Sequence, residues 1–151
     1  MANTQAMATS FKGELLTATH NFGTAPTRGT SAADSFKAAL YLASATINAS
    51  TTAYTATGEV SGAGYSAGGV AITAWNAPTT SGTTGYTTPT ASITYTSVTL
   101  TTAFDAVLIY NSSQSNKAVS VHTFGSQTVT AGTFTLTMPA NTSTTALIRL
   151  A

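Results

Sequence analysis

Large apolar side chains alternate with small polar ones in several short segments of the chain. Residues 133–138 read Thr-Phe-Thr-Leu-Thr-Met and residues 146–150 read Ala-Leu-Ile-Arg-Leu, and the same repeat of two occurs at 36–42, 70–74 and 119–122. This repeat is that of a β-strand with one buried face, not of a helix. Serine and threonine make up about a third of the 151 residues, and β-branched threonine favours strands. The sequence therefore predicts an all-β fold.

Two further segments refine this prediction. In residues 93–100 the apolar positions change parity, which predicts a bulge or corner near Ser97. Residues 106–110 read Ala-Val-Leu-Ile-Tyr without alternation, as expected for a strand covered on both faces. Ala131 and Gly132 are predicted to join a hairpin. With seven or eight strands in all, we expect an antiparallel β-sandwich of Greek-key or jelly-roll type over residues 35–151.

The segments between the predicted strands include two long loops. Residues 43–69 are rich in small residues and end in a run of glycines, and residues 76–90 contain two prolines. The stretch 62–67 matches the spacing of a dinucleotide-binding fingerprint. That fingerprint requires the glycines to open a helix, whereas here a strand follows, so we expect no nucleotide site.

The first 34 residues differ from the rest and are interpreted as an N-terminal arm and linker. Phe11 and Leu15 share one face of a short helix that Ser10 caps, and a linker rich in threonine, proline and glycine follows Phe22. These apolar residues are too few to build a core of their own. We expect the arm to contact a neighbouring subunit or a shell through Phe11, Leu15, Leu16 and Phe22.

Charged residues are scarce and scattered. Only 6% of the chain is charged, the formal net charge is +1 and there is no cysteine. Five dispersed basic residues cannot neutralise a row of phosphates, so nucleic-acid binding is not expected. No apolar run is long enough to cross a membrane, and the N-terminus lacks the layout of a secretory signal.

Catalytic chemistry is not predicted either. Four carboxylic acids are spread over arm, loop and strand, which argues against a catalytic pair. His20 and His122 lack the serine elbow that would make a triad specific. We therefore predict no catalytic, cofactor-binding or transition-metal residues, while a carbonyl-rich calcium site in a loop stays open.

Five segments resemble a widespread family of small virion structural proteins of tailed bacteriophages. The similarity covers nearly the whole chain, and its motifs lie in strands and loops and carry no catalytic assignment. The segments are SFKGELL at 10–16, SFKAALYL at 35–42, EVSGAGYSAGG at 59–69, AVLIYN at 106–111 and TAGTFTL at 130–136.

The resemblance implies a head decoration (cement) protein on the outer surface of the assembled capsid, made in the cytoplasm of the host bacterium. Its partners would be the major capsid protein and itself, as a homotrimer. Edge strands rich in threonine and poor in lysine also favour self-association. The alternative is a tail- or fibre-associated adsorption protein that binds a host-surface glycan or protein through Tyr65, Trp75 and Tyr86, because sugar sites use aromatic side chains. An enzyme is the third and least favoured interpretation.

Overall fold

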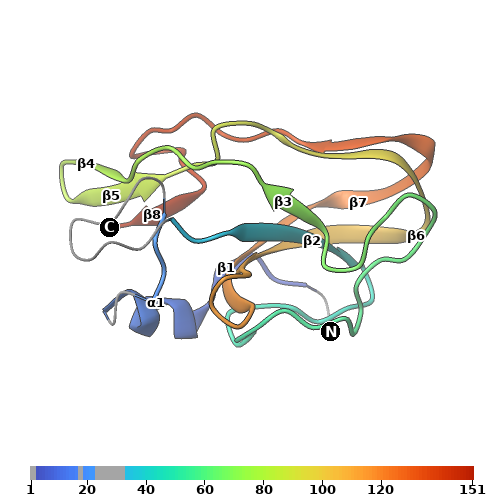
Figure 1. Ribbon diagram of the computed structural model, residues 1–151, viewed down its shortest axis with the longest axis horizontal. Helices are drawn as coiled ribbons and strands as arrows, with labels where there is room; N and C mark the ends of the chain where they lie inside the picture. Colours follow the sequence, from blue (N-terminus) through green and yellow to red (C-terminus); the bar gives the residue numbers. More distant parts are fainter. Residues whose placement is uncertain (1–2, 17–18, 23–32) are drawn as a thin grey trace.

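The computed structural model describes residues 3–16, 19–22 and 33–151, which form antiparallel sheets packed against each other (Figure 1). One sheet has five strands in the order β1-β7-β6-β2-β3, and the other has three in the order β4-β5-β8. This confirms the predicted all-β sandwich. The strands are β1 (Ala6–Met7), β2 (Phe36–Leu42), β3 (Val70–Ile72), β4 (Thr79–Ser81), β5 (Thr84–Thr87), β6 (Ile93–Asn111), β7 (Lys117–Leu136) and β8 (Ile148–Leu150).

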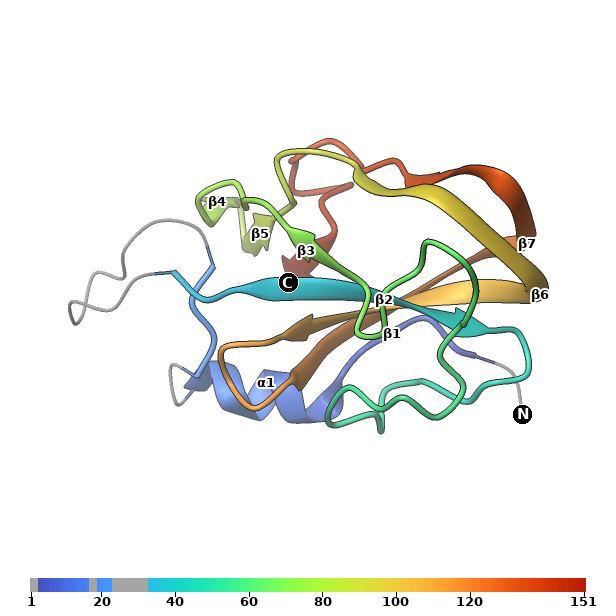
Figure 2. The same cartoon turned by 45° about the vertical axis from the view of Figure 1, so that its right-hand side comes forward.

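Most of the fold is one long hairpin that doubles back on itself. β6 has 19 residues and β7 has 20, and Figure 2 shows both strands turning over at one end of the molecule. The turn-over coincides with register shifts between Leu100 and Phe104, where residues 101–103 are exposed. The second half of β6 pairs with β2 in the first layer. The first half of β6 and the second half of β7 form the layer that covers it.

The covering layer contains two bulges that lie close together. Ser97 has φ 54° and Ala131 has φ 46°, and Val98 pairs with Gly132. The bulge at Ser97 lets Tyr95 and Val98 both face the core, as the sequence predicts. The predicted hairpin at Ala131 is wrong, because β7 continues through this position as a bulged strand. An extra residue in one strand changes parity without reversing the chain.

Two strands of the small sheet lie in the segment 76–90, which the sequence predicts to be a loop. Its hairpin β4–β5 pairs Thr79 with Tyr86, and β5 then pairs with β8. All three residues of β4 are exposed. They therefore show no alternation of buried and exposed side chains, the pattern that predicts a strand with one buried face.

The N-terminal segment is built into the same core. β1 pairs with β7, and the predicted short helix is present as α1 (Thr9–Leu16). The structure differs from the expectation that the arm needs a partner surface: Phe11 has no exposed surface, and Phe22 packs on Phe36 of β2. These rings bury their apolar area within their own chain. This burial is favourable by itself, so the rings do not need a partner surface to cover them. The side chain of Leu16 and the linker 23–32 lie outside the described residues.

Candidate functional site

All four carboxylates of the chain accept hydrogen bonds from within the chain. Glu14 and Asp34 bind groups near the turn between β6 and β7, Glu59 binds two tyrosines, and Asp105 accepts a bond of 2.6 Å from Asn3. Glu14 joins α1 to β7, Asp34 and Asp105 join irregular chain to β6, and Glu59 joins parts of the loop between β2 and β3. Their positions in the sequence did not predict these roles.

Glu14 connects α1 to the start of β7. Its two carboxylate oxygens lie 2.6 Å from Lys117 Nζ and 2.6 Å from His20 Nε2. Burial alone would raise the pKa of the Glu14 carboxyl, but the hydrogen bonds and positive charge of Lys117 and His20 outweigh it and hold the pKa below its ordinary value. The His20 side chain is completely buried. This ion pair therefore anchors the N-terminal segment to the sheet.

Asn111, which is fully buried at the end of β6, continues the same network. Its Nδ2 donates to Asp34 Oδ2 at 2.7 Å and lies 3.1 Å from His20 Nδ1. Asp34 also accepts from the backbone N–H of Asn21 and from Gln114. The chain before β2 is thus tied to the turn between β6 and β7. A buried side chain with this many partners is typical of a structural polar network.

Glu59 organises the long loop that follows β2. It accepts from the hydroxyls of Tyr54 and Tyr65 at 2.6 and 2.7 Å and from the backbone N–H of Gly68 at 2.8 Å. Burial, followed by the bond to Glu59, raises the pKa of Tyr54 to about 12 and raises that of Tyr65 further. Both phenols therefore stay protonated donors at neutral pH.

The glycine-rich stretch that resembles a nucleotide fingerprint lies against β6 instead. A Cβ atom at Gly62 would collide with the carbonyl oxygen of Thr99, and one at Gly64 with that of Ser97. The backbone N–H of Thr99 donates to the carbonyl of Ala63 at 2.8 Å between them. These glycines allow one backbone to approach another closely.

The two histidines do not form a catalytic triad. His122 Nε2 lies 2.8 Å from Ser120 Oγ, but Ser120 is only 2% exposed and no carboxylate of the described residues hydrogen-bonds to His122. Burial lowers the pKa of His122 to about 4, so the ring is neutral at pH 7. His20 contacts Glu14 and Asn111 and has no serine partner among the described residues. The hydrogen bonds of both histidines therefore join parts of the fold to one another.

The three aromatic residues named as candidate loop contacts lie in different surroundings. Trp75 is 8% exposed and packs edge-on against Phe22 and Phe36. Tyr65 is half-buried and its hydroxyl is bound to Glu59. Tyr86 lines a mostly apolar cavity of about 360 Å³. The structure thus does not bring the three rings together on one exposed surface.

That cavity lies between the N-terminal segment and the small sheet. Phe11, Leu15 and Phe22 line one side, and Tyr86 and Leu150 line the other. Among the described residues, His20 is the one acidic or basic side chain that lines it, and both of its ring nitrogens already contact Glu14 and Asn111. The hollow is therefore mainly apolar.

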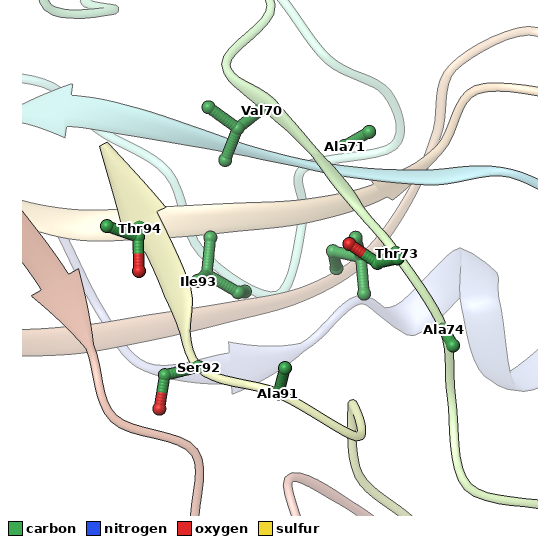
Figure 3. A pocket seen from close by; sticks show the side chains of 9 residues that line it. Val70, Ala71, Thr73, Ala74, Ala91, Ser92, Ile93 and Thr94 are labelled. Carbon is green, nitrogen blue, oxygen red and sulfur yellow. The ribbon is translucent and has the colours of Figure 1, made fainter. Parts of the chain in front are cut away.

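A second hollow of about 200 Å³ separates β3 from the start of β6. Figure 3 shows Val70, Ala71, Thr73 and Ala74 along β3 and the chain that follows it, and residues 91–94 at the start of β6 and just before it. None of the nine lining residues is titratable. This hollow marks the gap between the two layers and has no chemistry of its own.

The outer side of the covering layer carries a face of hydroxyl groups. Thr94 pairs directly with Thr135. Their neighbours along the strands point inward and are apolar: Ile93 and Tyr95 are buried, and Phe134 and Leu136 are half-buried. The bulges at Ser97 and Ala131 keep this separation along the whole layer. We call the exposed set the outer threonine face: Thr94, Thr96, Thr128, Thr130, Thr133 and Thr135.

No family model, curated protein or solved structure matches this chain. Within residues 3–16, 19–22 and 33–151, no three histidine or acidic side chains gather as metal ligands would. In the same residues, no helix has the length and apolar character needed to cross a membrane.

Proposed function

We propose that this chain is a structural protein of a tailed-phage virion, namely a decoration protein that binds the outside of the assembled head and stabilises it. The observation that carries the proposal is the uncharged outer threonine face on a fold whose carboxylates are all used internally. Surfaces that become buried between subunits are depleted in charged residues. The sequence resemblance to small virion proteins points the same way.

The strand edges support self-association, for which we propose a homotrimer. β1, β3, β4 and β8 are the outermost strands of their sheets, and none of them contains lysine or proline. Lysine and proline are the residues that usually protect an edge from pairing with another chain. A particle with many copies uses such contacts repeatedly.

Adsorption to a host glycan through a tail or fibre is the alternative. It is less well supported, because Trp75 lies in the core and the Tyr65 hydroxyl is bound to Glu59. Tyr86 is then the one candidate ring left to stack on a sugar. A sugar site usually combines stacked rings with several polar groups.

The proposal is tested by adding the purified protein to three preparations: heads that lack it, tails, and unassembled capsid protein. We expect saturable binding to the heads, with many sites per particle, and none to the other two. Heads treated in parallel with an unrelated all-β protein control for non-specific adsorption. Binding to tails alone, or to none of the three, would contradict the proposal.

A further inference from the structure

A groove follows the outer edge of β8. Three hollows of about 140, 220 and 410 Å³ lie along it. The first two share His122 and Leu147 as lining residues, and the last two share Met7 and Arg149. Because neighbouring hollows share lining residues, they lie side by side, and we call this row of hollows the groove.

The middle of this groove lies between two strand edges. β1 contributes Met7 to one wall and β8 contributes Arg149 to the other, and each strand is the last in its sheet. Leu150 is 42% exposed, the one large apolar side chain of the described residues with such exposure. Open strand edges beside apolar hollows are the features by which proteins bind an extended segment of another chain.

The groove also has one positive charge with spare donors. Arg149 donates from one guanidinium nitrogen to the carbonyl of Thr144 at 2.7 Å, and this is the only hydrogen bond of its side chain among the described residues. A guanidinium has five N–H groups and pairs best with a carboxylate. The floor beside it is formed by Ser120 and the neutral His122, which bind each other. An occupant of this groove is therefore expected to place an acidic group at Arg149.

We propose that this groove binds an extended β-strand of a different protein chain, one that carries an aspartate or glutamate opposite Arg149. A second copy of this chain fits less well, because its four carboxylates already hold its own segments in place. The inference rests on the proposed function only for the identity of the partner, which would then be a subunit of the shell. It assigns the edges of β1 and β8 to that partner and leaves those of β3 and β4 for self-association.

The test is site-specific photo-crosslinking in the cells that naturally produce the protein. A photoreactive amino acid replaces Leu150 in one variant and Ala56, an exposed loop residue outside the groove and the outer threonine face, in the matched control. We expect an adduct from the Leu150 position and none from the Ala56 position. Mass spectrometry of the adduct should identify an extended segment with an acidic residue near the crosslink.

Charge reversal then tests the role of Arg149. Arg149→Glu should reduce the adduct about tenfold, the effect of losing a charge-assisted hydrogen bond. Replacing the partner's acidic residue by lysine should restore it. Ala56→Glu serves as the control that adds negative charge elsewhere, and thermal unfolding confirms that each variant is folded.

The outcomes separate the two proposals. An acidic strand from a shell subunit supports both, whereas an acidic strand from a protein outside the virion supports the groove and contradicts the proposed function. Three outcomes would contradict the proposal that the groove binds an acidic strand of another protein: an adduct of two copies of this chain, an adduct without an acidic residue, or no adduct at all. The proposed function would not be affected by these three outcomes, because it is tested separately by adding the protein to heads.

Discussion

The ring of Phe22 stacks on the ring of Phe36, with centroids 4.5 Å apart and planes 17° apart. Trp75 lies edge-on to both. Phe22 belongs to the N-terminal segment and Phe36 opens β2, so the contact joins two segments separated by the linker. The aromatic cluster makes the N-terminal segment part of the hydrophobic core.

Replacing Phe22 by alanine should therefore destabilise the whole domain. Removing a packed aromatic ring costs about 3 kcal/mol, from lost apolar burial and the remaining cavity. Chemical denaturation followed by Trp75 fluorescence measures this directly. Thr135→Ala, an exposed change on the outer threonine face, should alter stability by less than about 0.5 kcal/mol. Equal stability of the Phe22 variant and the wild type would show that the N-terminal segment is a separate arm.

The Glu14 ion pair predicts a pH dependence. The pKa of Glu14 is lowered by folding, so its contribution to stability is complete above its ordinary value of 4.5 and is lost as the pH falls through the folded pKa. Glu14→Gln should lower the unfolding temperature at pH 7. Below pH 4.5 the unfolding temperatures of the variant and the wild type should become more similar, because Glu14 becomes protonated in the wild type. Melting curves at several pH values measure both. A difference that stays constant with pH would contradict this account of Glu14.

The tyrosines around Glu59 predict a local effect. Tyr65→Phe removes a hydroxyl that donates to Glu59 and accepts from the N–H of Leu40 at 3.0 Å. Unsatisfied partners of this kind cost about 1–3 kcal/mol. Hydrogen exchange should therefore increase in residues 59–69. Tyr86→Phe is the matched control, because the Tyr86 hydroxyl has no hydrogen-bond partner among the described residues. Similar exchange in both variants would argue against the network.

The bulge at Ala131 predicts a stabilising substitution. At φ 46° the side chain of an L-residue is strained, and glycine is not. Ala131→Gly should raise the free energy of unfolding by about 0.5–1 kcal/mol, after the greater freedom of glycine in the unfolded chain is subtracted. Ala103→Gly, at an exposed strand position where φ is not positive, should lower it by a similar amount. If both changes destabilise alike, the bulge is not strained.

The sequence was sufficient to predict the strands that have one clearly buried face. Phe134 to Leu136 alternate as predicted, and the parity change at Ser97 corresponds to a real bulge. The segment Phe36–Leu42 forms the predicted strand, but the expectation of a single buried face was wrong, because Ala39 and Tyr41 are buried as well. Alternation predicts strands well because half of each strand faces the core. It could not predict that β6 and β7 would turn over together, because the folded-back arrangement depends on contacts between residues that are distant in the sequence.

The polar network was beyond sequence reasoning for a related reason. Glu14 and Lys117 are 103 residues apart, and Asn111 and Asp34 are 77 apart. No local pattern distinguishes such carboxylates from solvated ones. The N-terminal segment was misjudged in the same way: Phe11 and Phe22 looked too few to build a core, but they add to one that β2 and β7 already provide.

The most direct test of the proposed function is to locate this protein on the virion by electron cryo-microscopy of purified particles, with and without its gene. We predict density for a folded-over hairpin repeated over the outer surface of the head. Particles without the gene should lack this density and lose their genome at lower temperature than the wild type. Density confined to the tail, or particles identical in both preparations, would contradict the account.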